Sequence, residues 1–134
     1  MFEHPQLHEV LYLSTLAPES NVKVVAQIAA QSRPANEAAG ITGLLAFDGM
    51  RFCHHIEGPR HEVLGLVQRI RQDSRHTDME VLHHGPLADR RFRRFNLGFC
   101  AVEDDDGLSR LKQSGPEEAL AQFLAMLPSI DLDP

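Results

Sequence analysis

The 134-residue chain has few cysteines and no long apolar segment. Cys53 and Cys100 are its only cysteines, and they stand far apart without Cys-x-x-Cys spacing, so neither a disulfide scaffold nor a zinc ribbon is expected. No window approaches the roughly 18–20 apolar residues that span a bilayer, and the N-terminal MFEHPQLHEV lacks the basic and apolar regions of a signal peptide. We therefore expect a soluble cytoplasmic protein with no membrane partner.

Positive charge is also scarce. The chain has 13 Lys and Arg against 19 Asp and Glu, a formal net charge of −6, which opposes binding to a phosphate backbone. No nucleic-acid partner is therefore expected. A hydrophobic fraction of 43% suffices for one core, and the length fits one domain of about 100–150 residues. We interpret residues 1–103 as the main folded unit and residues 104–134 as an acidic turn and helical extension of that same domain.

Apolar periodicity and turn residues predict an alternating order of strands and helices. The expected strands are Val10–Ser14, Ile41–Phe47, Arg51–Glu57, Met79–His83 and Phe95–Val102, and the expected helices are Val22–Ser32, Val63 to about Gln72, and one from Pro116 onward. Pro34 is expected to end the first helix. The βαββαββ order predicts an α+β, ferredoxin-like sheet with two helices on one face. The C-terminal helix, or failing that a second subunit, is expected to cover the other face.

The stretch RFCHHIEG places two adjacent histidines inside a predicted strand. Neighbouring strand residues point to opposite faces, so His54 and His55 cannot both bind one ion. His54 belongs with Phe52 and Ile56, whereas His55 belongs with Cys53 and faces the C-terminal helix. A metal site would draw on Cys53, His54, His55, His83, His84 and Cys100. None of their spacings matches a zinc motif, so we predict no metal, with His55, His83 and His84 near strand ends in partial contact with water.

Two other clusters have simple structural interpretations. Cys53 and Cys100 lie in apolar strands, which favours core packing over a reactive thiol, because such a thiol needs an electropositive, partly exposed setting. The arginines of RRFRR, residues 90–94, form either a solvated surface or a patch for phosphate or an acidic partner. No catalytic constellation emerges, so no enzyme activity is expected.

A different signal comes from SRPANEAAGITG, residues 32–43. Its small side chains allow a ligand to approach the backbone, and the amide of Asn36 offers a donor and an acceptor to a heteroaromatic edge. Opposite lie His54 and Tyr12, whose hydroxyl needs a partner if it is buried. Together these residues predict a site for a planar ring between the two helices.

In order and spacing, these pieces resemble the BLUF family, blue-light sensors that use flavin. The resemblance runs from about Val10 to Phe99 and rests on LYLSTLA, SRPANEAAGITGLL, RFCHHIEG, QRIRQDSRH and RRFRRFNLGF. It implies a flavin cofactor, FAD or FMN, between the two helices, and a sensory rather than enzymatic role. The cofactor-binding residues that it implies are Tyr12, Ile28, Ser32, Asn36, His54, Arg69, Ile70, Asp73 and His76.

In the family, Tyr12 matches the tyrosine that bonds a switching glutamine, and Asn36 matches the asparagine at the pyrimidine edge of the ring. Ile28, Ser32 and Ile70 match residues that line the ring, and Arg69, Asp73 and His76 match those around the ribityl chain and phosphate. A guanidinium such as that of Arg69 suits phosphate oxygens.

The chain departs from the family pattern at several positions. His54 stands where the family has its glutamine, Ala35 replaces the first Asn or His of the loop pair, and Phe95 and Leu97 correspond to the aromatic residue and methionine of the last strand. The family signals by electron transfer from the tyrosine to excited flavin, followed by rearrangement of the glutamine. An imidazole does not rotate or tautomerise as an amide does, so we expect an altered or absent photocycle.

Three hypotheses follow from the sequence. The first is a flavin-binding sensor that signals by association, either as a homo-oligomer or with a separate effector protein. The second is a degenerate interaction module that has lost flavin and light sensing. The third is a metal or haem site, or a small enzyme activity, built from the histidines and cysteines.

Overall fold

A computed structural model describes residues 6–99, 111, 115–126 and 131–132. In this part of the chain, strands and helices follow the order β1 (Leu7–Leu16), α1 (Val22–Ala39), β2 (Thr42–Phe47), β3 (Arg51–Pro59), α2 (Arg60–Arg71), β4 (His76–Leu87), β5 (Phe95–Phe99), α3 (Pro116–Ala125) and β6 (Asp131–Leu132). The strands form one sheet in the order β4-β1-β3-β2-β5-β6, antiparallel except for the parallel pair β2 and β5. The predicted α+β, ferredoxin-like fold is confirmed.

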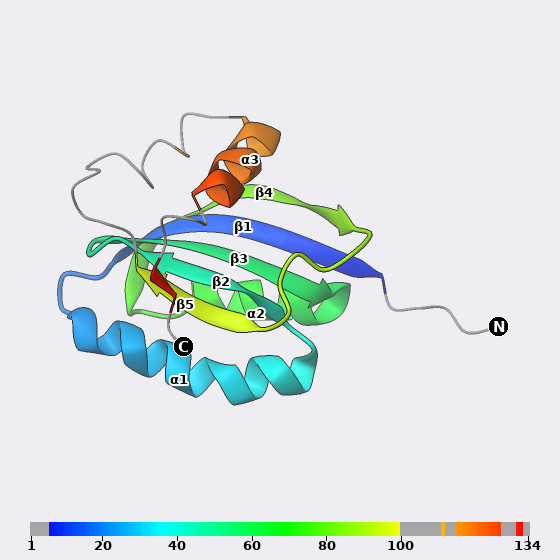
Figure 1. Cartoon of the computed structure of the whole chain (residues 1–134). Helices are drawn as coiled ribbons and strands as arrows, with labels where there is room; N and C mark the ends of the chain where they lie inside the picture. The colour runs from blue at the N-terminus through cyan, green and yellow to red at the C-terminus, as the bar shows by residue number, and fades with distance from the viewer. Residues whose placement is uncertain (1–5, 100–110, 112–114, 127–130, 133–134) are drawn as a thin grey trace.

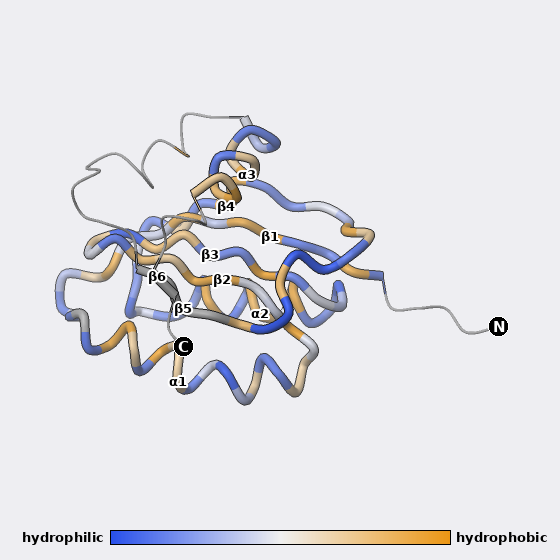
Figure 2. Tube along the Cα trace, viewed as in Figure 1, coloured by the Kyte–Doolittle hydropathy of each residue, from blue (hydrophilic) through white to orange (hydrophobic). Residues whose placement is uncertain are grey.

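The sheet is covered on both faces. Figure 1 shows α1 and α2 on one side and α3 on the other. Under α3, Leu120 and Phe123 pack with Leu11, Leu13 and Cys53 of the sheet. The opposite face carries two further apolar clusters beneath α1 and α2, and apolar residues run along the central strands in Figure 2. The expected covering role of the C-terminal helix is therefore confirmed, and none of the helices in the described ranges is long and apolar enough to cross a membrane.

Helix α1 differs from the prediction, because it continues through Pro34 to Ala39. Proline lacks an N–H and so removes the bond to the carbonyl four residues earlier. Both Pro34 and Ala30 are exposed, so water can hydrate that carbonyl. Gly40 ends the helix instead, in the left-handed conformation at φ 73°, with its N–H on the carbonyls of Asn36 and Glu37. The expected loop at residues 35–40 is wrong, and Asn36 lies on a helix.

Other boundaries also differ from the prediction. Strand β4 has 12 residues, rather than the five expected at Met79–His83, and β6 was not predicted. Helix α3 begins at Pro116, as expected from proline at a first helical position. The part of the last predicted strand beyond Phe99 and the acidic turn at residues 103–107 lie outside the described residues.

Candidate functional site

A cavity of about 210 Å³ opens between α1 and α2, above the central strands. All nine sequence-predicted binding residues line it: Tyr12, Ile28, Ser32, Asn36, His54, Arg69, Ile70, Asp73 and His76. The wall also includes residues that the sequence prediction left out, namely Ser14, Leu45, Phe52, Leu66, Arg75 and Phe95. We call this space the interhelical cavity. The fold therefore brings together side chains that lie up to 83 positions apart, from Tyr12 to Phe95.

Tyr12 and His54 form the floor of the cavity. They are direct partners in the β1–β3 register, and the Tyr12 hydroxyl lies 2.9 Å from Nδ1 of His54. Burial raises the pKa of Tyr12. Burial, together with His55 and His76, lowers the pKa of His54 to about 3, so both groups are neutral near pH 7. When the hydroxyl donates to Nδ1, the proton of the imidazole resides on Nε2.

Several buried polar atoms at the cavity have no hydrogen-bond partner. Among the described residues, four buried side-chain atoms are unsatisfied, and three of them belong to the cavity wall: Ser14 Oγ, His54 Nε2 and His76 Nδ1. His76 Nε2 donates to the carbonyl of Ile70 at 2.6 Å, which leaves Nδ1 as the acceptor in a neutral ring. Unpaired buried polar atoms cost stability and are rare in native proteins. The fourth is Nδ1 of His55, on the opposite face of the sheet, so three of the four unsatisfied atoms gather at the interhelical cavity.

The outer end of the cavity carries charge. Arg75 donates through Nε to Asp73 Oδ1 at 2.9 Å, and its backbone N–H donates to the same oxygen at 2.9 Å. These hydrogen bonds from Arg75 lower the pKa of Asp73. This pair is neutral overall. Arg69 is exposed and has no carboxylate partner within the described ranges, so one guanidinium remains available to an anionic group of a ligand. The pairing of Arg75 with Asp73 was missed from the sequence, although their spacing of two residues allows it.

On the opposite face of the sheet, His55 is fully buried. Its Nε2 lies 2.8 Å from Oε1 of Glu9, and its Nδ1 lies 3.8 Å from Oε1 of Glu57. Its ring lies nearly parallel to that of Phe123 of α3, with 6.5 Å between the ring centroids. The expected water contact is wrong for His55, because strand parity places both carboxylates beside it. His83 keeps partial exposure and His84 is exposed, as predicted for those two. The predicted separation of His54 and His55 onto opposite faces is confirmed.

Glu9 is the centre of this buried cluster. It also accepts a bond of 2.8 Å from Nε of Arg91. Burial raises the pKa of Glu9, but the bonds from His55 and Arg91 outweigh burial and bring it to about 2. The cluster therefore links β1, β3 and the loop after β4 through paired charges. Across the described segments, no three histidine, cysteine or acidic side chains are arranged to hold a metal ion, and Cys100 lies outside them.

The family comparison accounts for this α+β fold with a cavity between two helices. Residues 7–98 match the family described as "BLUF: Sensors of blue-light using FAD". This match covers more than half of the chain, so the chain belongs to the BLUF family. Domains of this family bind flavin and sense blue light.

Individual relatives support the same assignment. The structure resembles "BlrB - a BLUF protein, dark state structure" with a TM-score of 0.76 and 30% identity, covering 92% of this chain and 96% of that chain. A photoactivated adenylate cyclase subunit beta from Euglena gracilis is 44% identical over 55 residues, which are 41% of this chain and 6% of that protein. The blue light- and temperature-regulated antirepressor BluF of Escherichia coli (strain K12) is 27% identical over 128 residues, covering 87% of this chain and 32% of that protein. The chain thus spans about a third or less of these two relatives.

Proposed function

We propose that the interhelical cavity binds FAD and that this domain is a blue-light sensor whose photocycle is altered or absent. The observation that carries the proposal is the set of unpartnered buried atoms at Ser14, His54 and His76, which call for a polar ligand. FMN is the alternative cofactor, since the predicted contacts reach only the portion that both flavins share.

The residues of the wall fit the parts of a flavin. Ile28 and Ile70 offer apolar contact from the two helices, and the buried amide of Asn36 offers a donor and an acceptor to the ring edge. Arg69 and His76 suit a phosphate at the outer end. Bound flavin supplies absorption of blue light and the capacity to accept an electron.

His54 is the reason to propose a changed photocycle. It occupies the position at which we align the glutamine of the family, and its Nδ1 already holds the Tyr12 hydroxyl. A ring flip gives up that bond, and Phe95 also contacts the ring edge to face, at a centroid distance of 5.6 Å. With its pKa lowered to about 3 by burial and two neighbouring histidines, the ring does not gain a proton near neutral pH either. Neither a ring flip nor protonation therefore readily changes which nitrogen of His54 donates and which accepts a hydrogen bond.

Signalling is proposed to proceed by protein association, either between copies of this chain or with a separate effector protein. We also propose that residues 104–134 belong to the same domain as residues 1–103. In support, Leu111, Leu120 and Phe123 join the apolar cluster beneath α3, so the extension shares a core with the sheet.

Absorption spectroscopy tests the proposal. Purified protein, as isolated and after incubation with FAD or FMN, is expected to retain flavin absorbance through gel filtration. Blue light is expected to produce no ordinary reversible red shift in the wild type, because of His54. A normal shift in the wild type contradicts the altered photocycle.

The variant His54→Gln supplies the amide and is expected to gain the shift. His84→Gln is the matched control, because His84 is exposed and lies outside the cavity. If His54→Gln binds flavin and behaves as the wild type under light, then His54 is not what alters the photocycle.

A second candidate function is a flavin-free interaction module. His54 favours it, because the ring satisfies the Tyr12 hydroxyl without any ligand. A colourless protein that neither FAD nor FMN reconstitutes supports this candidate and excludes the first.

A further inference from the structure

The loop between β4 and β5 is fixed by buried carboxylates. Glu57 is fully buried and accepts the backbone N–H of Arg91 at 2.9 and 3.0 Å and that of Phe92 at 3.3 Å. The side chain of Arg91 turns inward to Glu9. The loop is hydrophilic in Figure 2, yet its backbone is bonded to the buried side chain of Glu57. Arg90, Arg93 and Arg94 therefore lie on a loop whose backbone position is fixed by these hydrogen bonds.

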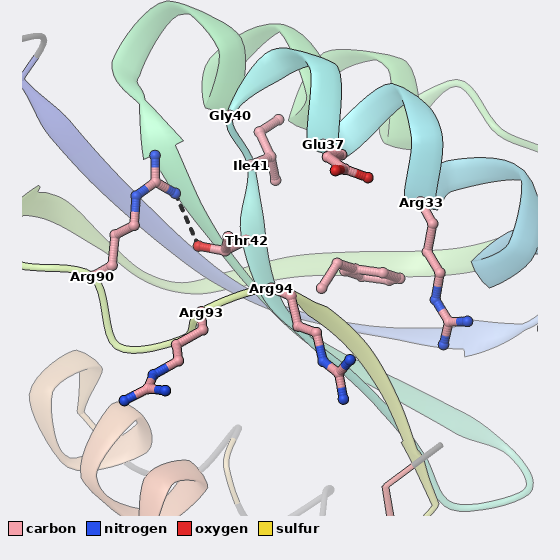
Figure 3. A pocket seen from close by; sticks show the side chains of 9 residues that line it. Arg33, Glu37, Gly40, Ile41, Thr42, Arg90, Arg93 and Arg94 are labelled. Carbon is pink, nitrogen blue, oxygen red and sulfur yellow. Dashed lines mark hydrogen bonds between the residues drawn. The ribbon is translucent and has the colours of Figure 1, made fainter. Parts of the chain in front are cut away.

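Beside this loop lies a hollow of about 500 Å³. We call it the arginine hollow, since its wall includes Arg33, Arg90, Arg93 and Arg94, together with Thr42 and Phe95. Figure 3 shows the loop arginines along one side and α1 along the other. Of the residues that line the hollow, only Phe95 also lines the interhelical cavity. The two sites are separate spaces with one wall in common.

Two of the arginines, Arg90 and Arg94, form hydrogen bonds with strand β2. Nη1 of Arg90 donates to the hydroxyl of Thr42 at 2.9 Å, and that hydroxyl donates to Oε2 of Glu57 at 3.0 Å. Arg90 is therefore linked through one hydroxyl to a buried carboxylate. The backbone carbonyl of Arg94 accepts the N–H of Gly43 at 3.2 Å, while its guanidinium has no carboxylate partner among residues with a described position.

The charge of the hollow is opposite to that of the chain. The whole sequence has a formal net charge of −6, whereas four guanidiniums and a single carboxylate, that of Glu37, surround this space. Guanidinium groups bind phosphate oxygens through two parallel hydrogen bonds. Small-molecule sites usually measure about 300–1,000 Å³, a range that includes this hollow.

We propose that the arginine hollow is a second binding site, for a small phosphorylated molecule. Arg94 contacts the phosphate, Arg90 adds positive charge from the Thr42 end of the hollow (Figure 3), and Glu37 accepts a hydrogen bond from a donor on the same ligand. This site does not depend on flavin, because its polar groups lie outside the interhelical cavity.

Isothermal titration with inorganic pyrophosphate, at constant ionic strength, tests the site. Saturable one-site binding is expected, and the double variant Arg90→Gln/Arg94→Gln is expected to weaken it at least about tenfold, a loss of 1.4 kcal/mol or more. Arg71→Gln is the matched control, since Arg71 is an exposed arginine outside both cavities. Because the two substituted side chains are also exposed, an unchanged thermal melt is expected and shows that folding is intact.

Two outcomes overturn the proposal. One is equal affinity in the wild type, the double variant and the control, or no saturation below about 1 mM, which marks nonspecific screening of surface charge. The other is loss of pyrophosphate binding once the protein is saturated with FAD, because this assigns the phosphate contacts to the flavin site. Retained binding in a protein that fails to bind flavin supports the second site while refuting the proposed function.

Discussion

Replacing Glu9 by glutamine tests whether the buried ion cluster stabilises the fold through a charged carboxylate. Glu9 is 3% exposed, and its pKa falls from 4.5 to about 2 because the bonds from His55 and Arg91 outweigh the cost of burial. At about 1.36 kcal/mol per pKa unit, the depressed value corresponds to about 3 kcal/mol of stability near pH 7. The direction of the pH dependence of stability follows from proton binding to Glu9. The unfolded chain takes up the proton first, so this stability is present above pH 4.5 and is lost as the pH falls toward 2.

Urea unfolding followed by circular dichroism measures the effect. Between pH 6 and pH 3, the wild type is expected to lose about 2 kcal/mol more than Glu9→Gln does, because the variant has no carboxylate to protonate at this position. The comparison uses the change with pH, so a lower stability of the variant at every pH does not disturb it. Glu19→Gln is the matched control, since Glu19 is exposed and its substitution should leave the wild-type dependence intact. Parallel profiles for the wild type and Glu9→Gln refute the reasoning.

Three further predictions concern other parts of the structure. Phe123→Ala is expected to lower the free energy of unfolding by about 3–5 kcal/mol, because Phe123 is fully buried and stacks on His55; a loss below about 1 kcal/mol in urea unfolding contradicts this packing. Pro34→Ala is expected to raise stability, by up to about 3 kcal/mol, because alanine restores an N–H inside α1; destabilisation in the same assay argues that the helix ends at Pro34. The His54 ring is expected to show no titration by NMR between pH 8 and pH 5, since its pKa lies near 3; a midpoint near 6.5 contradicts its burial.

The sequence was sufficient wherever the deciding contacts are local or follow strand parity. Alternation along β3 placed His54 and His55 on opposite faces, and apolar periodicity located both helices beneath the sheet. The nine cavity residues emerged together because the family resemblance aligned short motifs, and β-pairing then brought Tyr12 against His54. Each of these predictions depends on residues that are close in sequence or on motifs that the chain shares with a protein family.

The failures have non-local causes. A local rule ended α1 at Pro34, but an exposed proline and the Gly40 cap allow the helix to continue. His55 was assigned to water because its partners are remote: Glu9 lies 46 residues away from it, and Arg91 lies 82 residues from Glu9. No periodicity joins such positions. Only the assembled sheet shows that the polar ring enters a cluster of buried charges.

The two adjacent histidines of β3 differ in what surrounds the one ring nitrogen that each leaves without a hydrogen bond. Both rings are buried. His55 stands between two carboxylates that are themselves bonded to Arg91. Its Nδ1 has no hydrogen bond, but this atom lies 3.8 Å from Oε1 of Glu57, so it faces a carboxylate inside the protein. His54 shares its one bond with Tyr12 and leaves Nε2 facing a cavity where Ser14 and His76 also lack partners. Natural proteins break the rule of full satisfaction mainly at functional sites. From the three unsatisfied atoms at the interhelical cavity, rather than from the number of histidines, we infer that a ligand binds on the face beneath α1 and α2.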